Sequence, residues 1–531
     1  MNDGKKLNTR ASGIIAIAVM CSRVLGLVRE VLFNSLFGTA AMGLFLIAFR
    51  LPNLLRDLFA EGALSTAFVT VFSQKIEKDG PSAAWDLASK MLTLATVFMS
   101  AISLLGIVFA GPLVRLLAPG FDPADAGFTI LLTQIMYPFI LLVSLAALVM
   151  GALNSRQIFT APAMASSFFN IGSIAGGVIF GWLIDRSFGR NALIGLAIGT
   201  LVGGLLQLLV QLPSLRRVGF RFKPDFRWKD EGIQKILTLM VPSVIAASAV
   251  QVNVLVNSRF ASYEGAEAVT WLNSAFRLMQ LPIGVFGVAV ATITLPVISR
   301  IAADTDTSRF GPTLGKAMRL AVFLTLPSAV GLWFLSGPII GLIYEHGQFL
   351  AEDTKQTALA LQYYAIGLVA YSGIKVLSPA FYAIDRKWTP MLVSFASVGL
   401  NLALNYAFMF YLDFGHRGLA LSTTICATLN FTALYFLMMG PAKKLESGKF
   451  MGTILRCGAA AIPMALVCQG ILTEMPRIFP NQGTLLQATI VAAGVTASVA
   501  VYLGACLLLR VEETQSAMEI VLKKLGRRRT S

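Results

Sequence analysis

Fourteen long apolar segments constrain this chain more than any other feature of its sequence. A helix that crosses a bilayer needs about 20 mainly apolar residues, and each segment is long enough to supply one. Hydrophobic residues make up 56% of the 531 residues, charged residues only 13%, and the mean hydropathy is +0.73. We therefore expect an all-α, polytopic membrane protein. The predicted spans are residues 11–36, 40–74, 86–117, 126–152, 161–185, 191–213, 233–262, 268–299, 313–344, 354–384, 389–412, 418–440, 451–473 and 484–509.

Lysine and arginine are distributed unevenly over the segments outside these spans. If both termini are cytoplasmic, 30 of the 43 Lys and Arg residues fall in cytoplasmic segments and 6 in external loops. Cytoplasmic loops of membrane proteins are enriched in Lys and Arg, so the pattern predicts an even number of spans and two cytoplasmic termini. The net charge of +16 follows mostly from this anchoring, and we expect no nucleic acid partner.

The longest predicted cytoplasmic loop, residues 216–232, alternates basic and aromatic residues. Such a stretch can rest on an anionic membrane surface. A second interpretation, which we favour from the sequence, is a topology anchor that joins two halves of the chain.

Three short sequence matches recur in the same order at offsets of 226 to 230 residues. Six predicted spans separate the partners, so the two halves would share one orientation, as in transporters that bind substrate between parallel repeats. We expect an N-terminal lobe over residues 1–215, a connector over 216–232, a C-terminal lobe over 233–442, and two further spans with a basic cytoplasmic tail over 443–531. The matching pairs are 48–51 with 275–278, 111–114 with 337–340, and 154–156 with 384–386.

Seven basic residues lie in the stretches of these spans that we expect to be buried in hydrocarbon, accompanied there by only three acids. A Lys or Arg at mid-membrane costs about 2.5–3.5 kcal/mol on translocon scales, so exposing all seven to lipid would be expensive. A water-filled internal cavity of net positive charge avoids this cost and would bind an anion. The basic residues are Arg23, Arg29, Arg50, Arg56, Arg259, Arg277 and Lys375, and the acids are Glu30, Asp57 and Glu61.

The first predicted span carries two of these arginines. Arg23 and Arg29 are six residues apart, which separates them by about 120° around a regular helix. We expect Gly26 to bend or unwind the helix so that both side chains face one cavity. Guanidinium groups bind phosphate oxygens in a bidentate manner and stay charged at any relevant pH. Glu30 is expected to hold Arg29 in place when no substrate is bound.

The second span places Arg50, Asp57 and Glu61 at i, i+7 and i+11, which is one helical stripe if the helix persists through Pro52. In the eighth span, Arg277 and Gln280 share a face. The predicted substrate-binding set is Arg23, Arg29, Arg50, Arg56 and Arg277 with Ser22, Glu30, Asp57, Thr270, Gln280 and Lys375.

Other interpretations of the polar residues remain open. Each arginine could instead snorkel or form a buried ion pair, but the acids are too few to neutralise them all. We favour snorkelling for Arg259, near a span end, and leave Lys375 open. The asparagine pairs 253/257 and 401/405 could bind a small cation, although hydrogen bonds between helices are favoured.

Two absences from the sequence argue for a carrier over an enzyme. No G-x-x-x-x-G-K-[ST] loop occurs, which argues against ATP hydrolysis, and no acidic cluster suited to a metal follows a span. We expect no metal and no cofactor.

Residues 22–30, SRVLGLVRE, and 49–65, FRLPNLLRDLFAEGALS, resemble the MurJ (MviN) family of bacterial lipid II flippases. This family belongs to the multidrug/oligosaccharidyl-lipid/polysaccharide exporter superfamily. The resemblance runs essentially end to end. Further similar segments are 117–121, 211–213, 277–279 and 375–382.

The resemblance implies fourteen spans in two six-helix lobes plus two, in the bacterial inner membrane. It also implies movement of an undecaprenyl-diphosphate-linked peptidoglycan precursor, lipid II, from the inner to the outer leaflet. By analogy Arg23, Arg29, Arg56 and Arg277, with Arg50, would bind the diphosphate and head group, and the last two spans would form a groove for the lipid tail.

The expected partners are lipid II, membrane lipids and other cell-wall synthesis proteins. Coupling to membrane potential or a monovalent cation is a hypothesis, and the alternative function is export of another lipid-linked saccharide or amphipathic molecule.

The chain departs from some family members at three places. Residues 41–44 contain no acid, and Phe276 and Gln280 stand where those members carry acids.

Overall fold

A computed structural model describes residues 9–58, 64–304, 306–442, 445–478 and 483–514. Over these residues the secondary structure is helical with no strand, which confirms the predicted all-α class. Eleven described helices are long and apolar enough to cross a membrane, or up to 13 if each of two bent pairs is one span. Large apolar side chains such as Leu104, Ile293 and Leu466 are 64%, 74% and 69% exposed, as expected of surfaces that face lipid.

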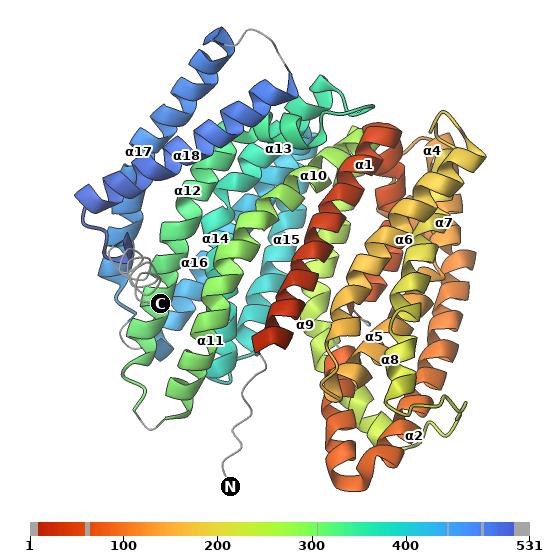
Figure 1. The fold of residues 1–531 in the computed structure, drawn as a ribbon. Helices are drawn as coiled ribbons and strands as arrows, with labels where there is room; N and C mark the ends of the chain where they lie inside the picture. The colour runs from red at the N-terminus through yellow and green to blue at the C-terminus, as the bar shows by residue number, and fades with distance from the viewer. Residues whose placement is uncertain (1–8, 59–63, 305, 443–444, 479–482, 515–531) are drawn as a thin grey trace. The chain divides into compact units, whose positions relative to one another are not determined.

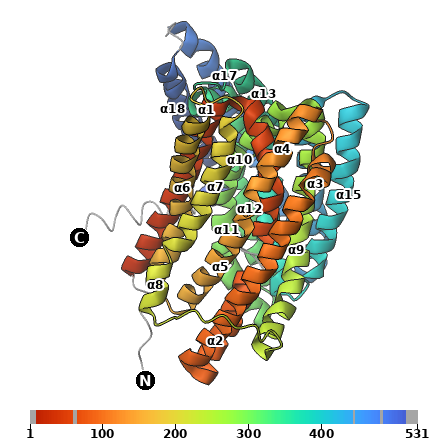
Figure 2. The ribbon, with the colours of Figure 1, turned by 90° about the vertical axis from the view of Figure 1, so that its right-hand side faces the viewer.

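The chain divides into two compact units, and residues 1–270 form the first (Figures 1 and 2). Its helices run from the red to the yellow-green part of the colour scale in Figure 1. They are α1 (Thr9–Leu55), α2 (Ser65–Val108), α3 (Ala110–Leu117), α4 (Pro123–Met136), α5 (Phe139–Ser155), α6 (Thr160–Ile184), α7 (Ala192–Leu209), α8 (Leu212–Arg217), α9 (Glu231–Ala261), the short η2 (Ser262–Glu264) and the start of α10 (Ala266–Pro282).

Two glycines break the long helices α1 and α2. Gly38 has φ 74° and ψ 169°, and Gly80 has φ 83° and ψ 172°, a left-handed backbone conformation that glycine adopts without strain. Gly38 lies in the gap between predicted spans 11–36 and 40–74, and Gly80 lies in the turn predicted after residue 74. Each long helix therefore contains parts of two predicted spans.

Helices α6 and α7 approach each other through glycines. A Cβ atom added to Gly199 would lie 2.2 Å from the backbone nitrogen of Gly177, and one added to Gly195 would lie 2.2 Å from that of Gly181. Small residues at these positions let the two backbones come close, which is the usual way that membrane helices gain packing energy.

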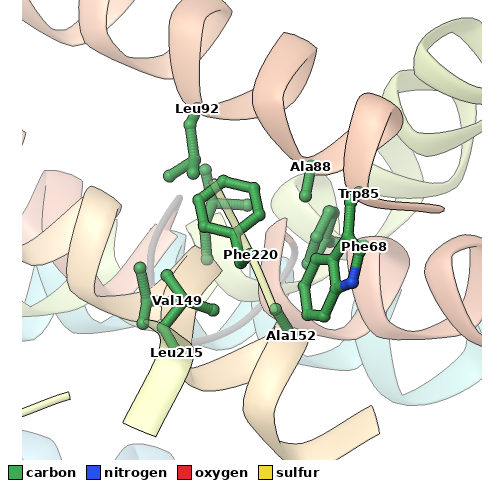
Figure 3. Close-up of a pocket in the computed structure, with 9 residues that line it drawn as sticks. Phe68, Trp85, Ala88, Leu92, Val149, Ala152, Leu215 and Phe220 are labelled. Atoms are coloured by element: carbon green, nitrogen blue, oxygen red, sulfur yellow. The ribbon is translucent and has the colours of Figure 1, made fainter. Parts of the chain in front are cut away.

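The core of the first unit holds the start of the connector against α2 and α5. Phe220 is 6% exposed, and its ring centroid lies 5.3 Å from that of Trp85. Figure 3 shows Phe220 and Trp85 beside a small cavity lined by apolar side chains, including Phe68 and Leu215. Because all of its lining residues are hydrophobic, this cavity belongs to the packed core and offers no group for an anionic head group.

Polar contacts fix the rest of the connector. The backbone N–H of Asp225 donates to Thr93 Oγ1 over 3.2 Å, and Lys90 Nζ lies 2.5 Å from Asp230 Oδ2. Arg227 donates to the Asp225 carboxylate, and this hydrogen bond lowers the pKa of Asp225 to about 2. The predicted connector is thus an ordered segment that follows the surface of α2.

Residues 271–531 form the second compact unit. Its helices run from green to blue in Figure 1. They are the rest of α10, the π-helical turn η3 (Ile283–Gly287), α11 (Val288–Ala303), α12 (Phe310–Tyr344), α13 (Ala351–Ile366), α14 (Leu368–Ala383), α15 (Trp388–Phe410), α16 (Gly415–Ala442), α17 (Ser447–Ile478) and α18 (Thr484–Leu508).

In the second unit, α17 and α18 pack on α12 through apolar and ionic contacts. The hydroxyl of Tyr502 donates to the carbonyl of Phe323 over 3.0 Å. At one end of α12, the guanidinium of Arg319 donates to Glu446 over 2.8 Å and to Glu513 over 2.9 Å. Glu446 precedes α17 and Glu513 follows α18, so one buried arginine ties both ends of the helix pair to α12.

The asparagines of α15 take part in a buried hydrogen-bond network with α16. Asn405 Nδ2 donates to Asn401 Oδ1 over 3.0 Å, and Ser422 joins both side chains. All three residues are fully buried. The structure therefore confirms hydrogen bonding between helices as the interpretation of this pair.

Candidate functional site

The first predicted arginine lies where α1 packs on α6. Asn170 Nδ2 donates to the carbonyl of Ser22 over 3.1 Å, and the same amide faces Gly26. Ser22 is half-buried and Arg23 is exposed. Asn170 thus fixes the backbone of α1 beside Arg23 and leaves the guanidinium accessible.

Arg29 lies six residues after Arg23 on α1, against an aromatic ring. Its guanidinium carbon is 5.0 Å from the centroid of the Phe169 ring, within the range of a cation–π contact. The neighbouring Glu30 is 8% exposed. The aromatic face orients the positive group, which suits a later contact with an anion.

The expected bend at Gly26 is wrong. The one residue of α1 with non-helical backbone angles is Gly38, so the helix continues regularly from Arg23 through Arg29. The two side chains therefore keep the angular separation of about 120° that six residues impose. The reason lies in the packing, because Asn170 of α6 supports the helix at Gly26.

Arg56 and Asp57 form a direct pair just beyond α1. Arg56 Nη2 and Nε donate to Asp57 Oδ1 over 2.9 and 3.1 Å, and the side chains are 23% and 26% exposed. The second carboxylate oxygen of Asp57 accepts from Gln251 Nε2 of α9 over 3.2 Å. Asp57 therefore holds Arg56 and links it to a helix about 190 residues away in the chain.

The predicted stripe of Arg50, Asp57 and Glu61 assumes a regular α-helix, and the structure departs from one after Leu55. The α-helix passes through Pro52 as required, but it ends at Leu55 and residues 56–58 form a π-helical turn. This wider turn changes the angular position of Asp57 relative to the half-buried Arg50. Glu61, like Gly62, lies outside the described residues.

Thr270 lies at the start of α10 and packs against α1. It is fully buried, and its hydroxyl donates to the carbonyl of Thr39 over 2.8 Å, directly after the break at Gly38. Nearby, a Cβ atom on Gly43 would lie 1.9 Å from the carbonyl oxygen of Ala266. This contact gives a physical reason for the absence of an acid at Gly43, where no side chain fits.

The second unit contributes the remaining predicted residues. Arg277 is half-buried and Gln280 exposed, one turn apart on α10, just before the π-helical turn η3. Lys375 of α14 is exposed. Arg259, which belongs to the first unit, donates to the carbonyl of Leu116 at the end of α3, so a helix terminus holds it.

Three residues that contact the predicted set were not predicted. Phe169 and Asn170 of α6 contact α1, and Gln251 of α9 contacts Asp57. A polar Asn or Gln within an apolar span is a sequence signal that was available for two of them. Their partners, 148 and 194 residues away in the chain, carry no local signal.

Comparison with known proteins assigns the chain to a family. Residues 33–492 match the family described as "Lipid II flippase MurJ". The chain belongs to the MurJ family. The matched region includes Arg50, Arg56, Arg277 and Lys375 and begins four residues after Arg29.

Individual relatives agree with the family match. The lipid II flippase MurJ of Burkholderia cenocepacia is 35% identical over 423 residues, which cover 78% of this chain and 81% of the relative. The probable lipid II flippase MurJ of Vibrio cholerae is 34% identical over 435 residues, covering 80% and 82%. That of Bdellovibrio bacteriovorus is 30% identical over 522 residues and covers 97% of both chains.

Solved structures agree with the family match and show which other proteins share the fold. A lipid II flippase MurJ in an inward closed conformation matches with a TM-score of 0.74 and 26% identity, over 93% of this chain and 98% of that one. An inward-facing multidrug resistance MATE family transporter of the MOP superfamily matches with a TM-score of 0.67 at 16% identity, over 82% and 98%. The second likeness shows a shared fold alone.

Proposed function

We propose that this chain moves lipid II from the inner to the outer leaflet of the bacterial cytoplasmic membrane, where it serves peptidoglycan synthesis. Membership of the MurJ family carries this proposal, since relatives that bear this function in their names match most of the chain. The arginines within apolar helices support it, because ionisable residues inside a membrane usually line a substrate pathway or pair with an opposite charge.

The proposed binding groups are the guanidiniums of Arg23, Arg29 and Arg277, with Arg50 and Arg56. A diphosphate offers several oxygens, and guanidinium binds them in pairs with fixed geometry. The cation–π contact of Arg29 with Phe169 and the ion pair of Arg56 with Asp57 support this role, because each arginine is oriented before substrate arrives. A preoriented group loses less conformational entropy on binding.

We further propose alternating access of an N-terminal lobe, residues 1–215, and a C-terminal lobe, residues 233–442. Transport needs the arginines to bind substrate differently in the two states, because a ligand shifts an equilibrium only through differential affinity. In this scheme α17 and α18 guide the lipid tail. The excess of Lys and Arg in the assigned cytoplasmic segments supports two cytoplasmic termini.

The energy source of the return step is proposed to be the membrane potential, with a monovalent cation as the second candidate. Each elementary charge that crosses the membrane contributes about 2.3 kcal/mol per 100 mV. Turnover in vesicles should therefore rise or fall with an imposed potential. Indifference of turnover to the potential, at constant ion composition, would remove this part of the proposal.

The first experiment measures leaflet exposure of the precursor in cells that depend on this chain alone. An external hydrolase that cleaves only outward-facing head groups reports translocation. We expect cleavage with the wild type and protection of the precursor with Arg29→Ala and with Arg277→Ala. Arg477→Ala is the matched control, because Arg477 pairs on the surface with Glu474 and is 74% exposed.

Three outcomes are decisive. Protection in both variants but not in the control assigns transport to the two arginines. Cleavage that does not depend on the protein overturns lipid II as the substrate and favours a related exporter of another lipid-linked saccharide. Cleavage in both variants, with normal protein levels, overturns the proposed binding role of Arg29 and Arg277.

A further inference from the structure

The end of α8 and the connector after it present a basic and aromatic surface that lies outside the proposed substrate-binding set. We call residues 216–229 the basic ribbon. It carries five basic residues that are exposed and have no ion-pair partner among the described residues: Arg216, Arg217, Arg221, Lys223 and Lys229. Exposed basic residues without ion-pair partners attract an anionic ligand, and the acids of the connector do not neutralise these five.

Two of the three acids of the connector are already engaged, and the third, Glu231, lies in the first turn of α9. Asp225 accepts hydrogen bonds from Arg227, and Asp230 pairs with Lys90 of α2. Both carboxylates thereby offset cations other than the five named above. The basic ribbon consequently keeps a high net positive charge toward solvent.

Two phenylalanines of the basic ribbon are exposed between the basic residues. Phe222 is 52% exposed and Phe226 is 64% exposed, whereas Phe220 is 6% exposed against Trp85. The ring centroids of Phe226 and Trp228 are 5.9 Å apart, so Phe226 contacts Trp228 while most of its surface remains exposed. Exposed aromatic rings interleaved with Lys and Arg are typical of segments that insert shallowly into a lipid head-group layer.

The basic ribbon is held beside the membrane-spanning helices at both ends. Phe220 anchors its first part in the core, and the bonds of Asp225 to Thr93 and of Asp230 to Lys90 fix its second part to α2. A segment fixed at the end of membrane spans has its accessible side chains within reach of lipid head groups. Entropy lost on binding is small because the backbone is already ordered.

We propose that the basic ribbon binds the anionic surface of the membrane that the protein spans, with Phe222 and Phe226 entering the head-group layer and the five unpaired basic residues contacting lipid phosphates. Charge complementarity commits the surface to anionic lipid, since polybasic segments next to a bilayer are attracted to it and the attraction extends over about one Debye length. The structure thus favours the membrane-surface interpretation of the connector over the anchor interpretation that the sequence favours.

The test places a polarity-sensitive fluorophore on a cysteine at Phe226 in the full chain, reconstituted into nanodiscs. Cys21, which is exposed, is first replaced by Ser, and the other four cysteines are buried. Asp79→Cys is the matched control position, because Asp79 lies beside the Gly80 break in an exposed turn without aromatic neighbours in sequence. Quenching by a nitroxide on the lipid head group is measured in zwitterionic discs and in discs with one third phosphatidylglycerol.

We expect quenching at position 226 to be at least twice as strong in the anionic discs, and to be weak at position 79 in both. High salt, or the triple variant Arg221→Gln/Lys223→Gln/Lys229→Gln, should remove most of the difference. Equal quenching at positions 226 and 79 overturns the membrane contact. Quenching at 226 that is independent of lipid charge and of the triple variant overturns the anionic preference.

Discussion

The guanidinium of Arg29 lies 5.0 Å from the centre of the Phe169 ring, so a helix of the same compact unit positions an arginine that sequence analysis assigns to substrate. Phe169 itself is 8% exposed and packs on Phe139, with ring centroids 5.6 Å apart. The aromatic ring orients the cation without adding a negative charge that would compete with a diphosphate.

Phe169→Leu should therefore slow precursor exposure while the protein still folds. A cation–π contact of this kind is worth about 1 kcal/mol, which predicts a roughly five-fold loss of rate. Phe139→Leu removes a neighbouring ring from the same cluster without touching Arg29, and should leave the rate nearly unchanged at a similar loss of thermal stability. Initial rates in the hydrolase assay distinguish the two. Equal rates in both variants would show that Phe169 acts only through packing.

Asp57 is expected to compete with substrate for Arg56. Its carboxylate accepts from Nε and Nη2 of Arg56, so it orients the guanidinium, and its negative charge repels a diphosphate that binds the remaining N–H groups. Asp57→Asn should raise precursor affinity by several-fold and lower turnover, because release of the anion becomes slower. Titration of the purified variant and the hydrolase assay measure the two quantities.

Gln251→Leu serves as the control for this prediction. It removes the hydrogen bond to Asp57 and leaves every charge in place, so its effect on affinity should be smaller. If Asp57→Asn weakened binding, the carboxylate would be a positioning group for Arg56 and competition would be the wrong account.

The pair of Lys90 and Asp230 predicts a loss of stability in acid. Burial raises the pKa of Asp230, but the hydrogen bonds from Lys90 and from the backbone N–H of Gly232 outweigh it, and the pKa is lowered. A lowered pKa in the folded state stabilises the fold fully above the unfolded value, about 3.9, and this contribution is lost as pH falls through the folded value. The difference in melting temperature between wild type and Asp230→Asn should thus be constant from pH 7 to 5 and shrink toward pH 3. An undiminished difference at pH 3 would contradict the assignment to the charge of Asp230, because an Asn oxygen also accepts the Gly232 N–H that caps the helix.

Arg319 predicts the largest loss of stability in the second unit. It is 5% exposed and bonds to Glu513, which is also 5% exposed. Removing one member of a buried ion pair leaves the other charge uncompensated and costs about 3–5 kcal/mol. Arg319→Met should lower the melting temperature of the detergent-solubilised protein strongly, and the further change Glu513→Leu should restore part of it.

The exposed pair of Arg477 and Glu474 provides the comparison for Arg319. An ion pair in solvent contributes about 0–1 kcal/mol, so Arg477→Met should be nearly neutral. Equal losses in the two variants would contradict the view that burial makes the Arg319 contacts important.

Sequence alone predicted the class of fold, because hydropathy over 20 residues and the positions of glycines are local properties. The break at Gly38 falls between the first two predicted spans for this reason. The favoured interpretation of Asn401 and Asn405, hydrogen bonds between helices, is also confirmed. The bend expected at Gly26 was wrong because a contact from α6, far away in the chain, supports a regular helix there.

The arrangement of the candidate site needed contacts that no local pattern contains. Gln251, which donates to Asp57, lies about 190 residues away in the chain. The π-helical turn over residues 56–58 also changes the angular position of Asp57, which the sequence analysis derived from a regular α-helix. Arg319 shows the same limit, since it lies near the start of the predicted span 313–344 and its partners lie beyond residue 440.

The close approach of α6 and α7 predicts a strict size limit at Gly199. A Cβ atom there would lie 2.2 Å from the backbone nitrogen of Gly177, so Gly199→Ala must push two backbones apart. Overpacking of this kind costs about 1–3 kcal/mol, and the resulting shift of α6 would also displace Phe169 from Arg29. We expect Gly199→Ala to lower both the melting temperature and the rate of precursor exposure. Gly127→Ala in α4, where an added Cβ meets nothing within 4 Å, should change neither, and a neutral Gly199→Ala would contradict the packing that the structure shows.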